Sequence, residues 1–68
     1  MPKDWRYISH ELNNKLFEKF IDIMGAENYI TVSGIMTQDK TRFSIFVSPQ
    51  GRDNVLANID TLKAMAGE

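Results

Sequence analysis

The chain contains no cysteine, and this absence limits what can stabilise it. Disulfide bonds and cysteine-ligated zinc are excluded, and His10 is the only histidine, so a metal site would need mainly carboxylates. A chain of 68 residues forms one small domain with a marginal hydrophobic core. We therefore predict a single domain over residues 1–68, without metal or cofactor, that gains core by forming a homodimer.

An excess of charge of either sign is also missing. Eight Lys and Arg residues stand against nine Asp and Glu residues, which gives a net charge of −1. The sequence also lacks an apolar run of the roughly 20 residues that a membrane span requires, and its first residues lack the apolar segment of a signal peptide. We therefore predict a soluble, cytoplasmic protein, in agreement with the lack of cysteine.

Apolar residues between Ile8 and Met24 recur at intervals of three and four, which is typical of one face of an α-helix. Ser9 is a suitable N-cap, and Gly25 can adopt the left-handed conformation that ends many helices. The pattern predicts a helix over residues 9–24.

Residues 28–36 and 41–48 are rich in β-branched and aromatic side chains and are separated by the polar stretch TQDK, which predicts an antiparallel hairpin. Strict alternation assigns the side chains to two faces. One face comprises Ile30, Val32, Gly34, Met36, Phe43, Ile45 and Val47, and the other comprises Tyr29, Thr31, Ser33, Ile35, Arg42, Ser44 and Phe46. Gly34 either lets a helix approach the sheet closely or marks a β-bulge.

A second helix is predicted near the end of the chain. It begins either at Pro49, with Ser48 as N-cap, or later at Asp53, and it ends at Gly67. The predicted order is α-β-β-α, an α+β domain in which two helices cover one face of the hairpin. Both edges of such a hairpin are free, so dimerisation could extend the sheet.

Catalytic residues are hard to assemble from this sequence. His10 has no evident nucleophile to activate, the spacing of Glu18 and Asp22 predicts a solvated helix face, and no glycine-rich phosphate-binding motif occurs. We predict that the protein is not an enzyme.

Two groups of residues are candidates for contact with a protein partner. One is the consecutive set Trp5, Arg6 and Tyr7, whose residue types dominate binding hot spots, although packing of Trp5 or Ile8 on the first helix as a hydrophobic staple is the favoured interpretation of this segment. The other is the apolar set Tyr29, Ile35 and Phe46 on the second sheet face. We predict a small protein-interaction module, an accessory regulator or inhibitor of a larger protein, of the kind that phages also encode.

Two alternatives remain open. Lys40, Arg42 and Arg52, together with nearby aromatic residues, could bind nucleic acid, although Asp39 and Asp53 dilute their charge. The protein could also be a structural subunit whose second sheet face contacts copies of itself.

Overall fold

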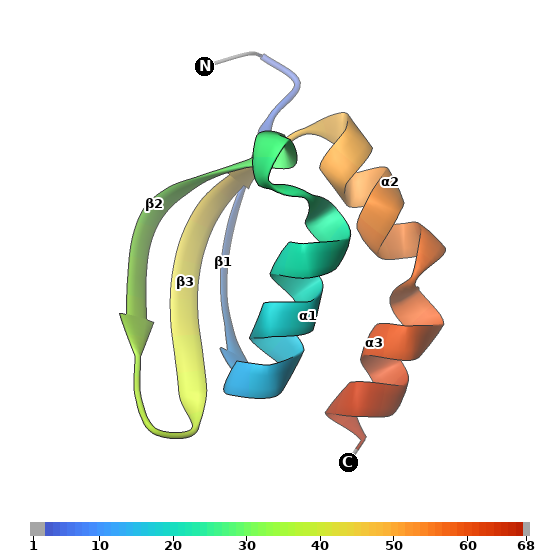
Figure 1. The fold of residues 1–68 in the computed structure, drawn as a ribbon. Coiled ribbons are helices and arrows are strands. Elements are labelled where there is room, and N and C mark those ends of the chain that lie inside the picture. Colours follow the sequence, from blue (N-terminus) through green and yellow to red (C-terminus); the bar gives the residue numbers. More distant parts are fainter. Residues whose placement is uncertain (1–2, 68) are drawn as a thin grey trace.

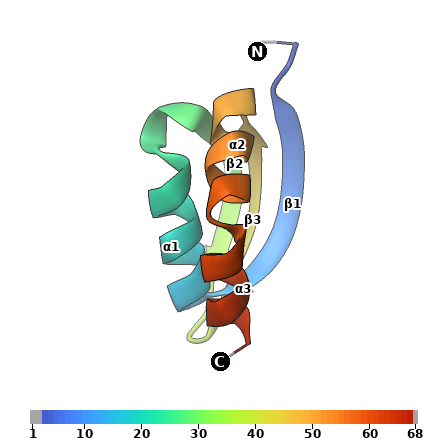
Figure 2. The same cartoon turned by 90° about the vertical axis from the view of Figure 1, so that its right-hand side faces the viewer.

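A computed structural model describes residues 3–67. Its elements are β1 (Arg6–Asn13), α1 (Asn14–Met24), the short 3-10 helix η1 (Ala26–Asn28), β2 (Tyr29–Met36), β3 (Lys40–Val47), α2 (Pro49–Ala57) and α3 (Ile59–Ala66). Within these residues the strands form an antiparallel sheet in the order β1-β3-β2 (Figure 1). The helices lie on one side of this sheet (Figure 2). The α+β class is confirmed, but the predicted order α-β-β-α is wrong, because a strand precedes the first helix.

The helix predicted over residues 9–24 is wrong in its first part. Residues 6–13 pair with β3 along their whole length, from Arg6 opposite Val47 to Asn13 opposite Lys40. Ile8 and Leu12 are four residues apart, a spacing that fits a helix and equally fits alternate positions of a strand. As a strand, this segment forms ladder hydrogen bonds with β3 and packs Ile8 and Leu12 against the core.

The change from strand to helix is fixed by two consecutive asparagines. Asn13, and not Ser9, is the N-cap of α1, and its Oδ1 accepts a hydrogen bond from the Leu16 amide at 2.8 Å. The Asn14 side chain donates to the carbonyls of Thr37 and Gln38 and accepts from the Thr41 hydroxyl. The start of α1 is thereby attached to the turn between β2 and β3. The helix ends as predicted at Gly25, which has a φ of 89°.

The core lies between β3 and α1. Phe43, Ile45 and Val47 of β3 are buried together with Met24 at the end of α1. The Phe43 ring lies 5.0 Å from the ring of Phe17 and 5.8 Å from that of Phe20, measured between centroids. We call the side of the sheet that carries these β3 residues the inner face. β3 is therefore the central strand. The prediction that β3 has a free edge is wrong, because β1 pairs with that edge.

The hairpin of β2 and β3 is confirmed, but half of the β2 face assignment is wrong. A bulge between Thr31 and Ser33 makes Val32 an extra residue and reverses the alternation. Ile30 therefore lies opposite Phe46 on the outer side, and Tyr29 lies opposite Val47 on the inner side. The assignment is correct after the bulge.

Gly34 does not serve a close helix approach. A Cβ atom built at this residue would meet nothing within 4 Å, so no described helix packs directly against it. The bulge lies just before it in the chain. Gly34 thus leaves open space on the inner face of an edge strand.

The C-terminal helical segment begins at the earlier of the two predicted positions. Ser48 is the N-cap, its Oγ accepts from the Gly51 amide at 3.0 Å, and Pro49 occupies the first turn. The segment is interrupted at Asn58, so two helices, α2 and α3, replace the single one predicted. The buried Asn28 accepts from the Ser48 hydroxyl and donates to the Met24 carbonyl, both at 2.9 Å. These bonds attach α2 to the end of α1.

Candidate protein-binding face

The described helices leave the opposite face of the sheet uncovered (Figure 2). Strand register assigns eleven residues to it. We call this surface the outer face, and it comprises Tyr7, Ser9, Glu11, Asn13, Ile30, Ser33, Ile35, Lys40, Arg42, Ser44 and Phe46.

One end of the outer face is apolar. Tyr7 and Ile30 lie on either side of Phe46, because both strands pair with β3 at that position. The Tyr7 and Phe46 rings are 5.4 Å apart between centroids and inclined by 60°. Tyr7 is 54% exposed and Ile30 is 45% exposed. An aromatic pair held by its own packing and flanked by an aliphatic side chain is thus available to a partner.

The middle of the outer face is polar, and its far end is charged apart from Ile35. Ser33, Ser44 and Ser9 follow one another across the sheet, and the Ser44 hydroxyl donates to that of Ser9 at 3.3 Å. Beyond them, Glu11 lies 3.7 Å from Arg42 and 3.8 Å from Lys40, measured between carboxylate oxygen and side-chain nitrogen. These charged side chains line a hollow of about 220 Å³ together with Ile35 and Thr37.

The predicted contact residues divide between the two faces. Tyr7, Ile35 and Phe46 share the outer face, whereas Arg6 and Tyr29 both lie opposite Val47, which places them on the inner side. Sequence reasoning missed Ile30, which strict alternation had placed on the wrong face. It also missed the serine row, which alternation would have indicated had residues 6–13 been recognised as a strand.

Trp5 precedes β1 and is half-buried. Its predicted role as a hydrophobic staple is wrong, because a staple residue directly precedes the N-cap and the N-cap of α1 is Asn13. His10 lies on β1 and not on a helix, on the inner side opposite Phe43, with ring centroids 6.5 Å apart.

The basic residues of the nucleic-acid alternative are separated. Lys40 and Arg42 both lie within 4.0 Å of the Glu11 carboxylate, which reduces their joint positive potential. Arg52 belongs to α2, on the opposite side of the sheet (Figure 2). The sheet therefore separates Arg52 from Lys40 and Arg42.

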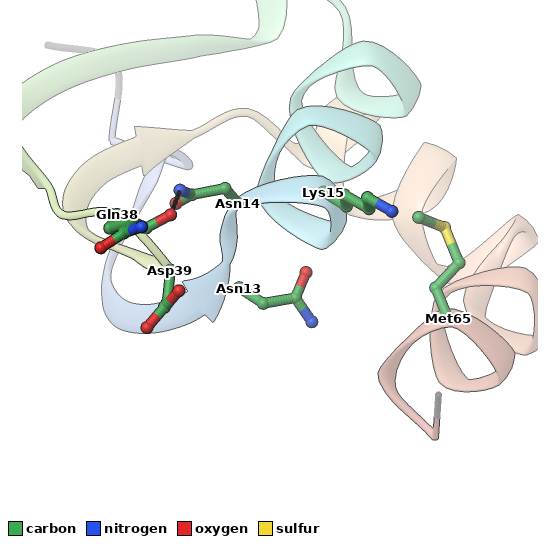
Figure 3. A pocket seen from close by; sticks show the side chains of 6 residues that line it. All are labelled: Asn13, Asn14, Lys15, Gln38, Asp39 and Met65. Atoms are coloured by element: carbon green, nitrogen blue, oxygen red, sulfur yellow. Dashed lines mark hydrogen bonds between the residues drawn. The ribbon is translucent and has the colours of Figure 1, made fainter.

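A polar hollow of about 420 Å³ lies where the start of α1 meets the β2–β3 turn and α3 (Figure 3). Asn14 points toward the turn at Gln38, while Lys15 and Met65 come from different helices. The side chains of Asn13 and Asn14 are already used for the helix cap and the turn. The best-placed polar groups of this hollow thus serve the fold.

An apolar groove of about 350 Å³ lies between β1 and α3. Its lining includes Ile8, Leu12, Phe20, Ile59 and Leu62, and Lys63 is the charged side chain along it. The groove reflects incomplete coverage of the inner face, because α3 packs mainly against α1.

Within residues 3–67, no group of three or more His, Asp or Glu side chains is placed to hold a metal ion. The same residues form no helix that is long and apolar enough to cross a membrane. Comparison of the chain with protein-family models, with curated proteins and with solved structures gives no match. The function must therefore be argued from the outer face itself.

Proposed function

We propose that this protein is a non-enzymatic interaction module that binds a larger protein through its outer face and acts as an accessory regulator or inhibitor. The observation that carries the proposal is the row formed by exposed Tyr7, half-buried Phe46 and exposed Ile30 on a sheet face that no described helix covers. Contiguous exposed apolar surface of this kind is typical of interaction sites. Aromatic residues also supply much of the binding energy at protein interfaces.

The outer face combines the apolar and polar parts that protein interfaces contain, placed side by side along the sheet. The aromatic row supplies the apolar part, and the row of small serines allows a partner to approach the sheet closely. At the far end, two basic side chains share the single carboxylate of Glu11. A partner surface that presents an apolar patch beside an acidic group would match this pattern.

The remaining expectations are also part of the proposal. We place the protein in the cytoplasm on the basis of its cysteine-free sequence. We also propose that it forms a homodimer, since a small domain without disulfides or metal gains core by association. Nucleic-acid binding is the weaker alternative, because Arg52 lies apart from Lys40 and Arg42.

Affinity capture from the source cells, followed by titration with the purified partner, tests the proposal. A double variant, Tyr7→Ala with Phe46→Ala, removes the aromatic pair. Leu56→Ala is the matched control, since Leu56 is 65% exposed but belongs to α2. We expect the double variant to raise Kd at least about tenfold, a loss of about 1.4 kcal/mol, and the control to bind normally.

Circular dichroism must show that the double variant is folded. Unchanged binding by a folded double variant would contradict a role of the outer face. Equal loss with Leu56→Ala would place the contact on the helices instead.

A further inference from the structure

β2 is an edge strand with an unusual combination of properties. Its eight residues, YITVSGIM, include no charged side chain and no proline. Of the seven large hydrophobic residues exposed within residues 3–67, four belong to β2, namely Ile30, Val32, Ile35 and Met36. An edge strand presents backbone N–H and C=O groups that another strand can pair with, and natural proteins usually protect such an edge with charges or proline. Here the protection is limited to the bulge.

The bulge determines which part of β2 can pair. It interrupts the regular backbone between Thr31 and Ser33. Residues 33–36 pair with β3 in regular register, from Ser33 opposite Ser44 to Met36 opposite Thr41. The free edge of β2, which points away from β3, is therefore a regular four-residue segment that ends at the turn.

Gly34 and Met36 make this segment complementary to itself. A Cβ at Gly34 would meet nothing within 4 Å, and Met36 is 66% exposed on the same inner face, two residues further on. In an antiparallel pair about a twofold axis beside Ile35, Gly34 of each copy lies opposite Met36 of the other. Each copy thus supplies both the open space and the side chain that fills it, as an isologous contact requires.

We propose that residues 34–36 of β2 pair antiparallel with the same residues of a second copy of this chain. The twofold axis brings the two Ile35 side chains together on the outer face. The two sheets join in the order β1-β3-β2-β2-β3-β1. Met36 of each copy covers part of the groove of about 370 Å³ that Phe17 and Ile21 form with β2.

The assembly closes at two copies. The strands left at the ends of the joined sheet are the two β1 strands, which carry Arg6, His10 and Glu11. Charged side chains on an edge oppose further pairing. This proposal concerns contacts between copies and does not depend on what binds the aromatic end of the outer face.

Light scattering on the purified chain measures the mass without any partner. We expect about twice the chain mass of 7.8 kDa for the unaltered protein. Ile35→Lys places a charge beside its own copy at the axis, and we expect that variant to have the single-chain mass while circular dichroism shows that it is folded.

A cysteine cross-link tests the geometry directly, because the chain has no cysteine of its own. Residues directly opposed in an antiparallel pair have Cα atoms about 4.5–5.5 Å apart, within the range that a disulfide spans. Under mild oxidation we expect Ile35→Cys to form a covalent dimer and the control Ser9→Cys, on the outer face of β1, to remain mostly uncross-linked.

A single-chain mass for the unaltered protein at all micromolar concentrations would overturn the proposal. So would a dimer that survives Ile35→Lys and does not cross-link through Ile35→Cys, because its contact would then lie elsewhere. The variant Tyr7→Ala with Phe46→Ala should stay dimeric, so loss of partner binding and loss of the dimer are separate results.

Discussion

β1 and β2 flank the same central strand, yet their surroundings differ. Ile8 and Leu12 of β1 pack against the core, and β1 carries Arg6, His10 and Glu11. β2 carries no charge, and almost all of its residues are exposed. The cause is the position of α1, which packs against β1 and β3 and leaves an open groove beside β2.

This difference between the two strands means that β1 contributes mainly to the stability of the domain, whereas β2 remains available for binding. β1 contributes partly buried apolar side chains that pack against the core, and its charges make its free edge unattractive to other strands. β2 adds ladder hydrogen bonds but little burial, so its side chains and its free edge remain available. In this domain the strand that contributes least to the core is the one best suited to assembly.

The largest expected effect tests the role of β1. Leu12→Ala should lower the free energy of unfolding by about 2–3 kcal/mol, because it removes apolar contacts with the core. Met36→Ala, the matched change on β2, should alter it by no more than about 0.5 kcal/mol. Urea denaturation of both variants, in the Ile35→Lys background so that dimerisation does not contribute, measures the difference. Equal losses would show that β2 is as well packed as β1.

Two glycine substitutions compare a position with open space around it, Gly34, with a closely packed position, Gly51. Gly51→Ala should destabilise the domain by about 1–3 kcal/mol, because its Cβ would lie 3.0 Å from Asn28 Cβ and from Val47 Cγ1. Gly34→Ala should stabilise the single chain by about 0.5–1 kcal/mol, since alanine suits a strand better than glycine does. Thermal unfolding in the Ile35→Lys background measures both.

Without that background, Gly34→Ala should weaken the dimer although it stabilises the single chain, because the added methyl group occupies space assigned to Met36 of the second copy. Dilution followed by light scattering would detect this reversal. A dimer strengthened by Gly34→Ala would argue against the proposed register.

The smallest expected effect concerns the charges of β1. Glu11→Gln removes two solvent-exposed ion pairs, with Lys40 and Arg42, and should cost no more than about 0.5 kcal/mol at low salt. The difference should shrink at high salt, where exposed charges are screened. Denaturation at two salt concentrations checks this. A large effect that does not depend on salt would give Glu11 a structural role that its exposed ion pairs do not predict.

Several features could be predicted because they depend on neighbouring residues. Ser48 followed by Pro49 specifies a helix start, Gly25 ends α1, and two β-branched runs around TQDK form the hairpin. Tyr7 was identified by residue type and Ile35 and Phe46 by strand alternation, and the structure places all three on the outer face. The location of Arg6, Tyr29 and Ile30 depended on register, which residue type alone does not reveal.

The sequence by itself determined a small α+β domain without disulfides, its hairpin, the helix end at Gly25 and the helix start at Ser48 and Pro49, because propensities, turns and caps act over a few residues. The tertiary structure decided that residues 6–13 form a strand, since Ile8 and Leu12 fit both periods and only pairing with β3 provides ladder hydrogen bonds and burial together. It also decided the bulge at Val32, and with it the side chains that share the outer face. A one-residue shift in register reverses every side chain before it.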